Sequence, residues 1–293
     1  MRKKIPTIDL QFYTINLTIL PPAENTSEYY SGLIVKIFKA QNVLKFGSFF
    51  YRMTRLDLIE TSEGNAYFGV ISKYISLDDV EWVEENDTPV NYSVPDNVNG
   101  RTASYEFVFY PKTHRFAFIK RGRIEQNSSR GPAPLKAIVH YVKNAVDLML
   151  DIENKFCEVN IVQSDQIFDE IFSSNVKSLD LTVSYSNPGL DDDHDETMDE
   201  YLRKAHAGKT RVVMSPDSTG VIDTDAIFTR GLLNLAKENG KVKAKVETSE
   251  GTKFINTESH PDVNQITIEK SGNIELKFIT NIMKQLRKNI PNE

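Results

Sequence analysis

The stretch SYEFVFYPKTHRFAFIKRGR, residues Ser104–Arg123, decides the predicted fold. Aromatic residues occupy every second position over Tyr105–Phe109, and again at Phe116 and Phe118. A period of two in aromatic and β-branched residues predicts strands. The short polar break Pro111–His114 lies between the two runs, and such a break predicts a β-hairpin. The stretch therefore predicts an antiparallel sheet with an aromatic core.

The second predicted strand of the hairpin runs directly into a basic cluster. Lys120, Arg121 and Arg123 lie at its end, and the polar loop Gln126–Gly131, which contains Arg130, follows. Exposed cations near aromatic side chains are one way to hold a nucleic-acid backbone and stack bases. We therefore predict a nucleic-acid-binding site at these four cations.

Composition limits the classes of function. The chain has 293 residues, which suits two domains, and a formal net charge of −6. This charge disfavours a protein that binds nucleic acid over its whole surface, although local basic patches remain compatible with it. The single cysteine, Cys157, lies in an apolar run and predicts a core residue in a reducing, cytoplasmic protein. No apolar run reaches the length of a membrane span, so no membrane partner is expected.

The first part of the chain is mainly strands with two helices. Alternating patterns predict strands at 8–20, 47–60 and 65–75 before the hairpin. Helical spacing of apolar residues predicts helices at 24–40 and 132–153. The second helix can supply either core packing or a subunit interface, and we expect a homo-oligomer.

The second part of the chain alternates strands and helices. Predicted strands cover 156–162, 176–185, 210–214, 241–248, 252–256 and 265–269, with 273–276 as an extension of the last. Predicted helices cover 165–172, 196–207, 223–239 and 277–288. This change of rhythm predicts an α+β protein of two domains. Residues 1–155 form an N-terminal domain with the aromatic hairpin, and residues 156–293 form a C-terminal mixed α/β domain.

A second basic group lies on the predicted strand at 241–248. Lys241, Lys243 and Lys245 occupy alternate positions, so all three face the same side of a sheet. They are candidate nucleic-acid contacts. The alternative is that they lie on an edge strand, where lysines block aggregation.

The sharpest catalytic hypothesis is a nuclease motif. His260-Pro261-Asp262, followed by Glu275-Leu276-Lys277, has the form PD…ExK. In that chemistry Asp262 and Glu275 bind a magnesium ion and Lys277 positions or activates the attacking water. However, Lys277 begins a predicted helix, whereas the ExK residues of true members lie on a strand. A chance match is therefore the competing interpretation.

Two other features favour structural interpretations. Asp191–Glu200 contains seven acids and His194, but it lacks the spacing of a calcium loop and suits an exposed loop with an acidic helix start. Gly208–Thr210 has the Gly-Lys-Thr of a phosphate-binding loop. The glycine required five residues earlier is Arg203, so Gly208 more simply ends a helix.

The order of these segments resembles a family catalogued as domain of unknown function 4747. The matching residues lie within the first 150 residues and are Pro95, Asn97, Tyr105, Phe107, Phe109, His114, Arg115 and Phe118. The resemblance implies an early strand, an aromatic hairpin and a long helix behind it, and it implies no activity.

The two-part layout is more loosely similar to the phage lambda exclusion protein RexA and other small phage-defence proteins that touch DNA. This resemblance implies a place in phage–host conflict. Together with the basic clusters, it predicts a non-enzymatic protein that binds or senses nucleic acid without a cofactor. The alternatives are a magnesium-dependent nuclease and a protein-binding inhibitor or adaptor.

Overall fold

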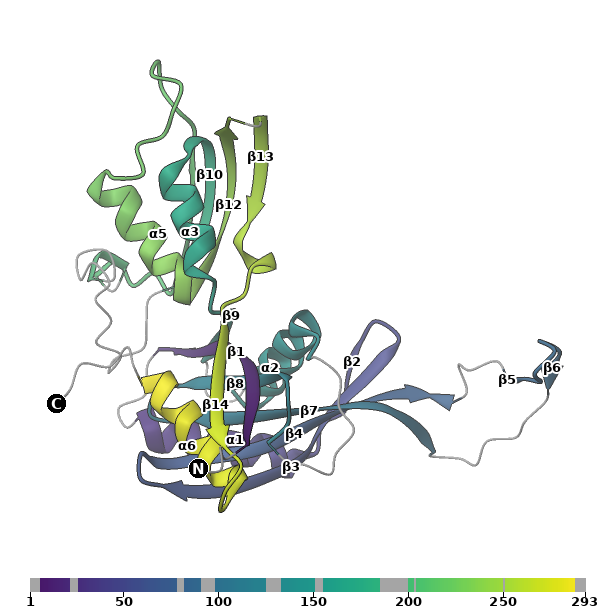
Figure 1. The fold of residues 1–293 in the computed structure, drawn as a ribbon. Helices are drawn as coiled ribbons and strands as arrows, with labels where there is room; N and C mark the ends of the chain where they lie inside the picture. Colours follow the sequence, from purple (N-terminus) through teal and green to yellow (C-terminus); the bar gives the residue numbers. More distant parts are fainter. Residues whose placement is uncertain are drawn as a thin grey trace, which may run out of the picture.

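The structure is a computed structural model. It describes residues 6–21, 26–77, 82–90, 98–124, 133–150, 155–184, 200–202, 204–249 and 251–287. The predicted α+β class is confirmed: two antiparallel sheets carry the helices (Figure 1).

The larger sheet has eight strands in the order β14-β1-β8-β7-β4-β3-β2, with β9 also paired to β1. They are β1 (Thr7–Leu20), β2 (Leu44–Phe46), β3 (Phe49–Thr61), β4 (Gly64–Ser76), β7 (Asn99–Tyr110), β8 (Arg115–Arg121), β9 (Phe156–Ile161) and β14 (Val263–Glu269). The predicted aromatic hairpin is β7–β8, in which Phe109 pairs with Phe116 and their rings stack at 4.3 Å. This hairpin lies at the centre of the sheet, as its apolar sequence requires.

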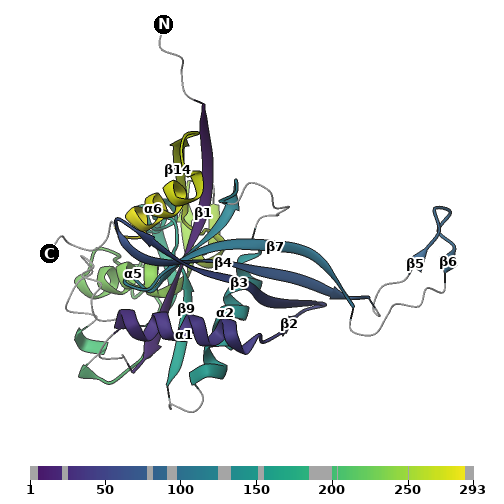
Figure 2. The same ribbon diagram turned by 90° about the horizontal axis from the view of Figure 1, so that it is seen from below.

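Helices cover both faces of the large sheet. In Figure 2, α1 (Thr26–Ala40) and α2 (Leu135–Leu150) lie on one side of the strands, and α6 (Ile274–Arg287) lies on the other. Alternate residues of each strand point to opposite faces of the sheet, where they form two separate hydrophobic cores. Phe107 therefore packs towards α2, whereas Val108 packs towards α6. The apolar stripe of α2, from Ala137 to Leu150, is buried in the first core, so this helix supplies core packing.

The smaller sheet has four strands in the order β11-β10-β12-β13. They are β10 (Asn175–Ser184), β11 (Lys209–Met214), β12 (Gly240–Thr248) and β13 (Gly251–Asn256). Helices α3 (Asp165–Ser173) and α5 (Ile227–Asn239) pack on one face and bury Leu179, Leu181 and Val242. Of the predicted 196–207 helix, residues 196–199 lie outside the described residues.

The division of the strands between the two sheets does not follow the predicted domain boundary between residues 155 and 156. The first half of β1 pairs with β14 and its second half pairs with β9. Because β9, β14 and α6 belong to the large-sheet unit, the small sheet is an insertion between Ile161 and Val263. The small sheet is antiparallel throughout. Pairing between residues about 250 positions apart leaves no local signal in the sequence.

The predicted strand extension at 273–276 is wrong. Residues from Ile274 onwards form the first turn of α6. The Asn273 side-chain oxygen accepts a hydrogen bond from the Leu276 amide at 3.0 Å, which satisfies a free donor at the start of the helix.

The ends of β4 and β7 extend together beyond the rest of the large sheet and form an arm (Figure 1). Between them in the sequence lies a short pair of strands, β5 (Trp82–Val83) and β6 (Pro89–Val90). Over the described ranges, none of the helices has the length and apolar content needed to cross a membrane.

Candidate nucleic-acid interface

Among the described residues, no helix packs on one face of the small sheet, and this face displays the lysines of β12. Val242, Ala244 and Val246 are buried towards α3 and α5. The alternate residues Lys241, Lys243 and Lys245 therefore point to the opposite side. We call this side the open face.

Strand β11 adds two more cations to the open face. The register places Arg211 opposite Thr182, and Thr182 opposite Lys241, so the three side chains form a row across the sheet. Lys209 lies two residues before Arg211 on β11. A shallow depression of about 240 Å³ lies among Asp180, Thr182, Arg211, Lys241 and Lys243. The open face thus carries five cations, and three of them line this depression.

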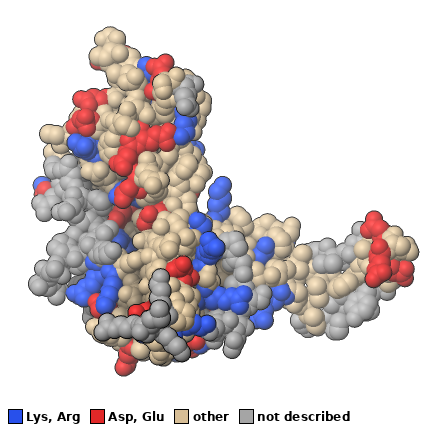
Figure 3. Space-filling model, viewed as in Figure 1, with Lys and Arg blue, Asp and Glu red and all other residues tan. Residues whose placement is uncertain are grey.

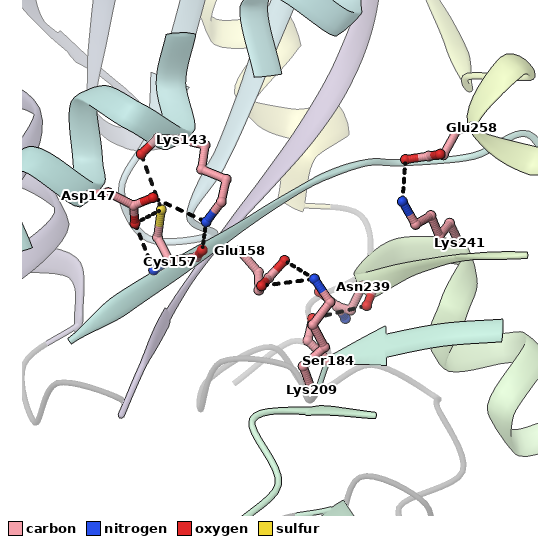
Figure 4. A network of polar contacts seen from close by, with 9 residues as sticks. All are labelled: Lys143, Asp147, Cys157, Glu158, Ser184, Lys209, Asn239, Lys241 and Glu258. Atoms are coloured by element: carbon pink, nitrogen blue, oxygen red, sulfur yellow. Dashed lines mark hydrogen bonds and ion pairs between the residues drawn. The ribbon is translucent and has the colours of Figure 1, made fainter. Parts of the chain in front are cut away.

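Three of these cations have carboxylate partners. Arg211 forms two hydrogen bonds with Asp180, at 2.8 and 2.7 Å, and these hold the pKa of Asp180 below its usual value. Figure 4 shows the other two pairs. Lys209 contacts Glu158 of β9 at 2.9 Å, and Lys241 contacts Glu258 at 3.4 Å.

Lys243 and Lys245 carry the excess positive charge. Neither forms an ion pair with any residue that the structure describes. Lys245 instead lies 5.8 Å from the ring centre of Phe254, its neighbour on β13. Lys243 lies directly opposite Asp180, but Arg211 already binds that carboxylate, so Lys243 and Lys245 leave an excess of positive charge that favours an anionic ligand.

Phe254 completes the open face, and the sequence analysis missed it. Its side chain is 77% exposed, although a phenylalanine in a strand is usually part of a core. Val213 of β11, 65% exposed, adds apolar surface on the same side. Alternation along β13 places Phe254 and Ile255 on opposite faces, but only the structure shows that Ile255 is the buried one.

The edge-strand interpretation of these lysines is wrong. Strand β12 lies between β10 and β13 and pairs with both over most of its length. An internal strand has no free edge to protect, so its lysines have no role in blocking edge-to-edge aggregation.

The other predicted basic group lies on the large sheet. Lys120 occupies a β-bulge at the end of β8, and its ammonium is 5.4 Å from the ring centre of Tyr13. Arg121 pairs with Gln11, and Arg123 follows the turn at Gly122. Arg130 lies outside the described residues. The two predicted basic groups are therefore on different sheets.

The three nuclease candidates are not brought together. Asp262 precedes β14, whereas Glu275 and Lys277 lie in the first turn of α6, beyond the other end of that strand. Helix α6 runs back along β14, because Gln285 donates a hydrogen bond to the Gln265 carbonyl. Strand and helix rise separate Asp262 from Glu275 by about 25 Å. These two carboxylates are too far apart to share a magnesium ion.

Asp262 has a different environment from the one that the motif predicts. It lines a cavity of about 450 Å³ with His260 and Glu170, and burial raises its pKa. Its carboxylate accepts a hydrogen bond from Asn264 at 2.7 Å. In the described part of the chain, no group of three or more His, Cys, Asp or Glu side chains could hold a metal ion. Of the acidic run, residues 191–199 lie outside that part.

Cys157 is a core residue, as predicted. It is fully buried, and its thiol donates a hydrogen bond to Asp147 at 3.2 Å (Figure 4). Burial raises the pKa of this thiol, which disfavours the nucleophilic thiolate.

The residues that carry the family resemblance have structural roles. Phe107, Phe109 and Phe118 belong to the core under α1 and α2. His114 stacks on Tyr30 with ring centres 4.1 Å apart, and Arg115 forms a buried ion pair with Glu238 of α5. Pro95 and Asn97 lie outside the described residues.

A search of curated proteins found no match to this chain. A family model does match, and it extends over residues 8–284, well beyond the first 150 residues that carried the resemblance. The chain therefore belongs to the family described as domain of unknown function DUF4747.

Proposed function

We propose that the open face of the small sheet binds single-stranded nucleic acid. The observation that carries the proposal is the pair of lysines on β12, Lys243 and Lys245, which form no ion pair within the described residues and lie beside the exposed ring of Phe254 on β13. Cations that follow a phosphate backbone, next to an aromatic ring on which a base can stack, are the elements of sequence-tolerant single-strand binding.

An exposed ring favours a single strand over a duplex. Stacking on Phe254 requires a base whose face is free, and in a duplex both faces are covered by neighbouring base pairs. A four-stranded antiparallel sheet with helices on its other face also offers an extended, rigid platform. These features support contact with several successive nucleotides.

The distribution of charge supports the same side. Seen from the side of α3 and α5, acidic side chains gather over the small-sheet unit (Figure 3). Asp165, Asp169 and Glu170 all lie on α3. A polyanion approaching the helices meets carboxylates, whereas one approaching the open face meets lysines. This distribution of charge favours binding of a polyanion on the open face rather than on the helix side.

Three finer features of the proposal rest on the sequence alone. The proposed role in phage–host conflict rests on the looser resemblance to RexA. The proposal of a non-enzymatic role without a cofactor rests on the motifs of the sequence, and the proposal of a cytoplasmic location rests on its single cysteine. A homo-oligomeric state is a prediction that light scattering of the purified protein checks.

The proposal is tested by titrating the full chain against fluorescent single-stranded DNA, single-stranded RNA and double-stranded DNA at two salt concentrations, with and without magnesium. We expect salt-sensitive binding that is tightest for a single strand and independent of magnesium. Absence of binding at low salt overturns the proposal, and the search then turns to a protein partner. Magnesium-dependent cleavage contradicts the non-enzymatic part of the proposal.

A further inference from the structure

A second cluster of cations and aromatic rings lies on the large sheet at the base of the arm. Lys45 pairs with Phe50, Phe50 with Tyr74, and Tyr74 with Arg101, across β2, β3, β4 and β7. Directly paired residues share one face of a sheet. The row therefore places two aromatic rings between two cations, and Lys and Arg side chains gather in this part of Figure 3.

A cavity of about 450 Å³ lies beside this row. It is lined by Val43, Phe50, Arg52, Tyr74, Ser76 and Asn99. This volume is in the range typical of small-ligand sites. The lining combines aromatic rings, one guanidinium and two neutral polar side chains, and it contains no carboxylate.

Arg52 is the unusual residue of this cavity. Its Nε is buried and has no hydrogen-bond partner, although buried polar atoms are generally satisfied. No carboxylate that the structure describes forms an ion pair with Arg52. Its guanidinium lies 5.6 Å from the ring centre of Tyr74. An anionic group bound in the cavity neutralises the Arg52 guanidinium and accepts a hydrogen bond from its Nε.

We propose that this cavity binds a nucleotide. The phosphate is held by Arg52, with Arg101 and Lys45 at the ends of the row, and the base packs against Tyr74 and Phe50. A planar aromatic ligand with an anionic group fits this lining, because arginine pairs with phosphate in a fork and bases stack on tyrosine and on guanidinium planes. The site lies on the other sheet from the open face, so it stands independently of the function proposed above.

The test uses calorimetric titration of the full chain with AMP, GMP, CMP and UMP, each up to about 5 mM. At least one nucleotide binds, and its nucleoside and ribose 5-phosphate each bind at least roughly tenfold more weakly. Absence of binding by all four nucleotides overturns the proposal. Ribose 5-phosphate that binds as tightly as the best nucleotide also overturns it.

Two variants test the phosphate contact and the base contact separately. The Arg52→Met variant binds the nucleotide no more tightly than its nucleoside. The Tyr74→Leu variant binds the nucleotide no more tightly than ribose 5-phosphate. Arg55→Met is the matched control, because Arg55 lies on the same strand and over the ring of Phe68 but pairs with Asp57 outside the cavity. Unchanged nucleotide affinity in a folded Arg52→Met protein contradicts the assignment.

Two further comparisons identify the source of the nucleotide and keep the two sites apart. A 5′-phosphorylated tetranucleotide that competes with the free nucleotide indicates a chain end, and failure to compete indicates a free nucleotide; either result supports the cavity. Lys243→Gln/Lys245→Gln retains nucleotide binding, because these lysines lie on the small sheet. Loss of nucleotide binding in that variant overturns the separate site.

Discussion

Arg115 of the large sheet and Glu238 of the small-sheet unit form an ion pair whose side chains are only 4% and 5% exposed. Arg115 begins β8, and Glu238 lies in the last turn of α5. Beside it, Asn16 of β1 donates a hydrogen bond to Asn239 at 3.0 Å. These contacts join the inserted small sheet to the large sheet whose sequence it interrupts, so they fix the orientation of the open face.

Removal of one partner of this pair leaves the other buried and uncompensated. We expect Arg115→Met to lower the free energy of unfolding by about 3–5 kcal/mol, measured by urea denaturation. The double variant Arg115→Met/Glu238→Leu recovers most of that loss. Lys253→Met breaks a pair with Glu170 that is 50% and 33% exposed, and it costs less than about 1 kcal/mol. Equal effects of the two single variants contradict this account.

The local patterns of the sequence predicted most strands and helices. The alternation around Phe107 and Phe116 identified the central hairpin, and the lysines of β12 were placed correctly on one face. The pairing of β1 with β14 was not predicted, because it depends on contacts between distant segments. The sequence also gave Arg115 no visible partner, since Glu238 lies 123 positions away.

The candidate sites show the same limit. The lysines of the open face follow from alternation, but its aromatic ring, Phe254, looks like a core residue until the position of the helices is known. The cavity at the arm combines Phe50 and Arg52 of β3 with Tyr74 of β4, and no short motif joins them. The nuclease motif failed for the opposite reason, because closeness in sequence did not bring Asp262 near Glu275.

Acid is expected to destabilise the fold through His114. Burial, aided by the charge of Arg115, lowers the pKa of His114 from 6.5 to about 3. Between these values the unfolded chain binds more protons, so stability is fully present above pH 6.5 and falls as the pH falls towards 3. From pH 7 to pH 5, the contribution lost is about 2 kcal/mol.

The pH dependence is measured by urea denaturation at pH 7 and pH 5. His114→Asn removes the titrating group while tolerating the positive φ of 56° at this position, so its stability changes less between the two pH values than that of the parent. The control His206→Asn alters an exposed histidine with a similar φ of 52° and retains the parent's dependence. Identical dependence in the parent and His114→Asn contradicts the assignment.

Phe254 is expected to contribute by stacking. Phe254→Ala weakens binding of single-stranded DNA by about 1–3 kcal/mol, measured by fluorescence anisotropy, and leaves the salt dependence unchanged. Phe254→Trp retains binding, because indole also stacks. Ile227→Ala, at a residue 78% exposed at the start of α5, is the control and leaves affinity unchanged. If Phe254→Ala binds as tightly as the parent, the ring is not a stacking platform.

The central claim is that the lysines of β12 neutralise phosphates, and the salt dependence of single-strand binding tests it most directly. Neutralising Lys243 and Lys245 together, as Lys243→Gln/Lys245→Gln, reduces the slope of log affinity against log salt by about 1.4, since each phosphate contact contributes about 0.7. The matched double variant, Lys237→Gln/Lys253→Gln, alters lysines that pair with Asp165 and Glu170 on the helix side, and it keeps the parent's slope. A slope that falls only in the first variant is the predicted result, and a slope unchanged by both contradicts the open face as the binding surface.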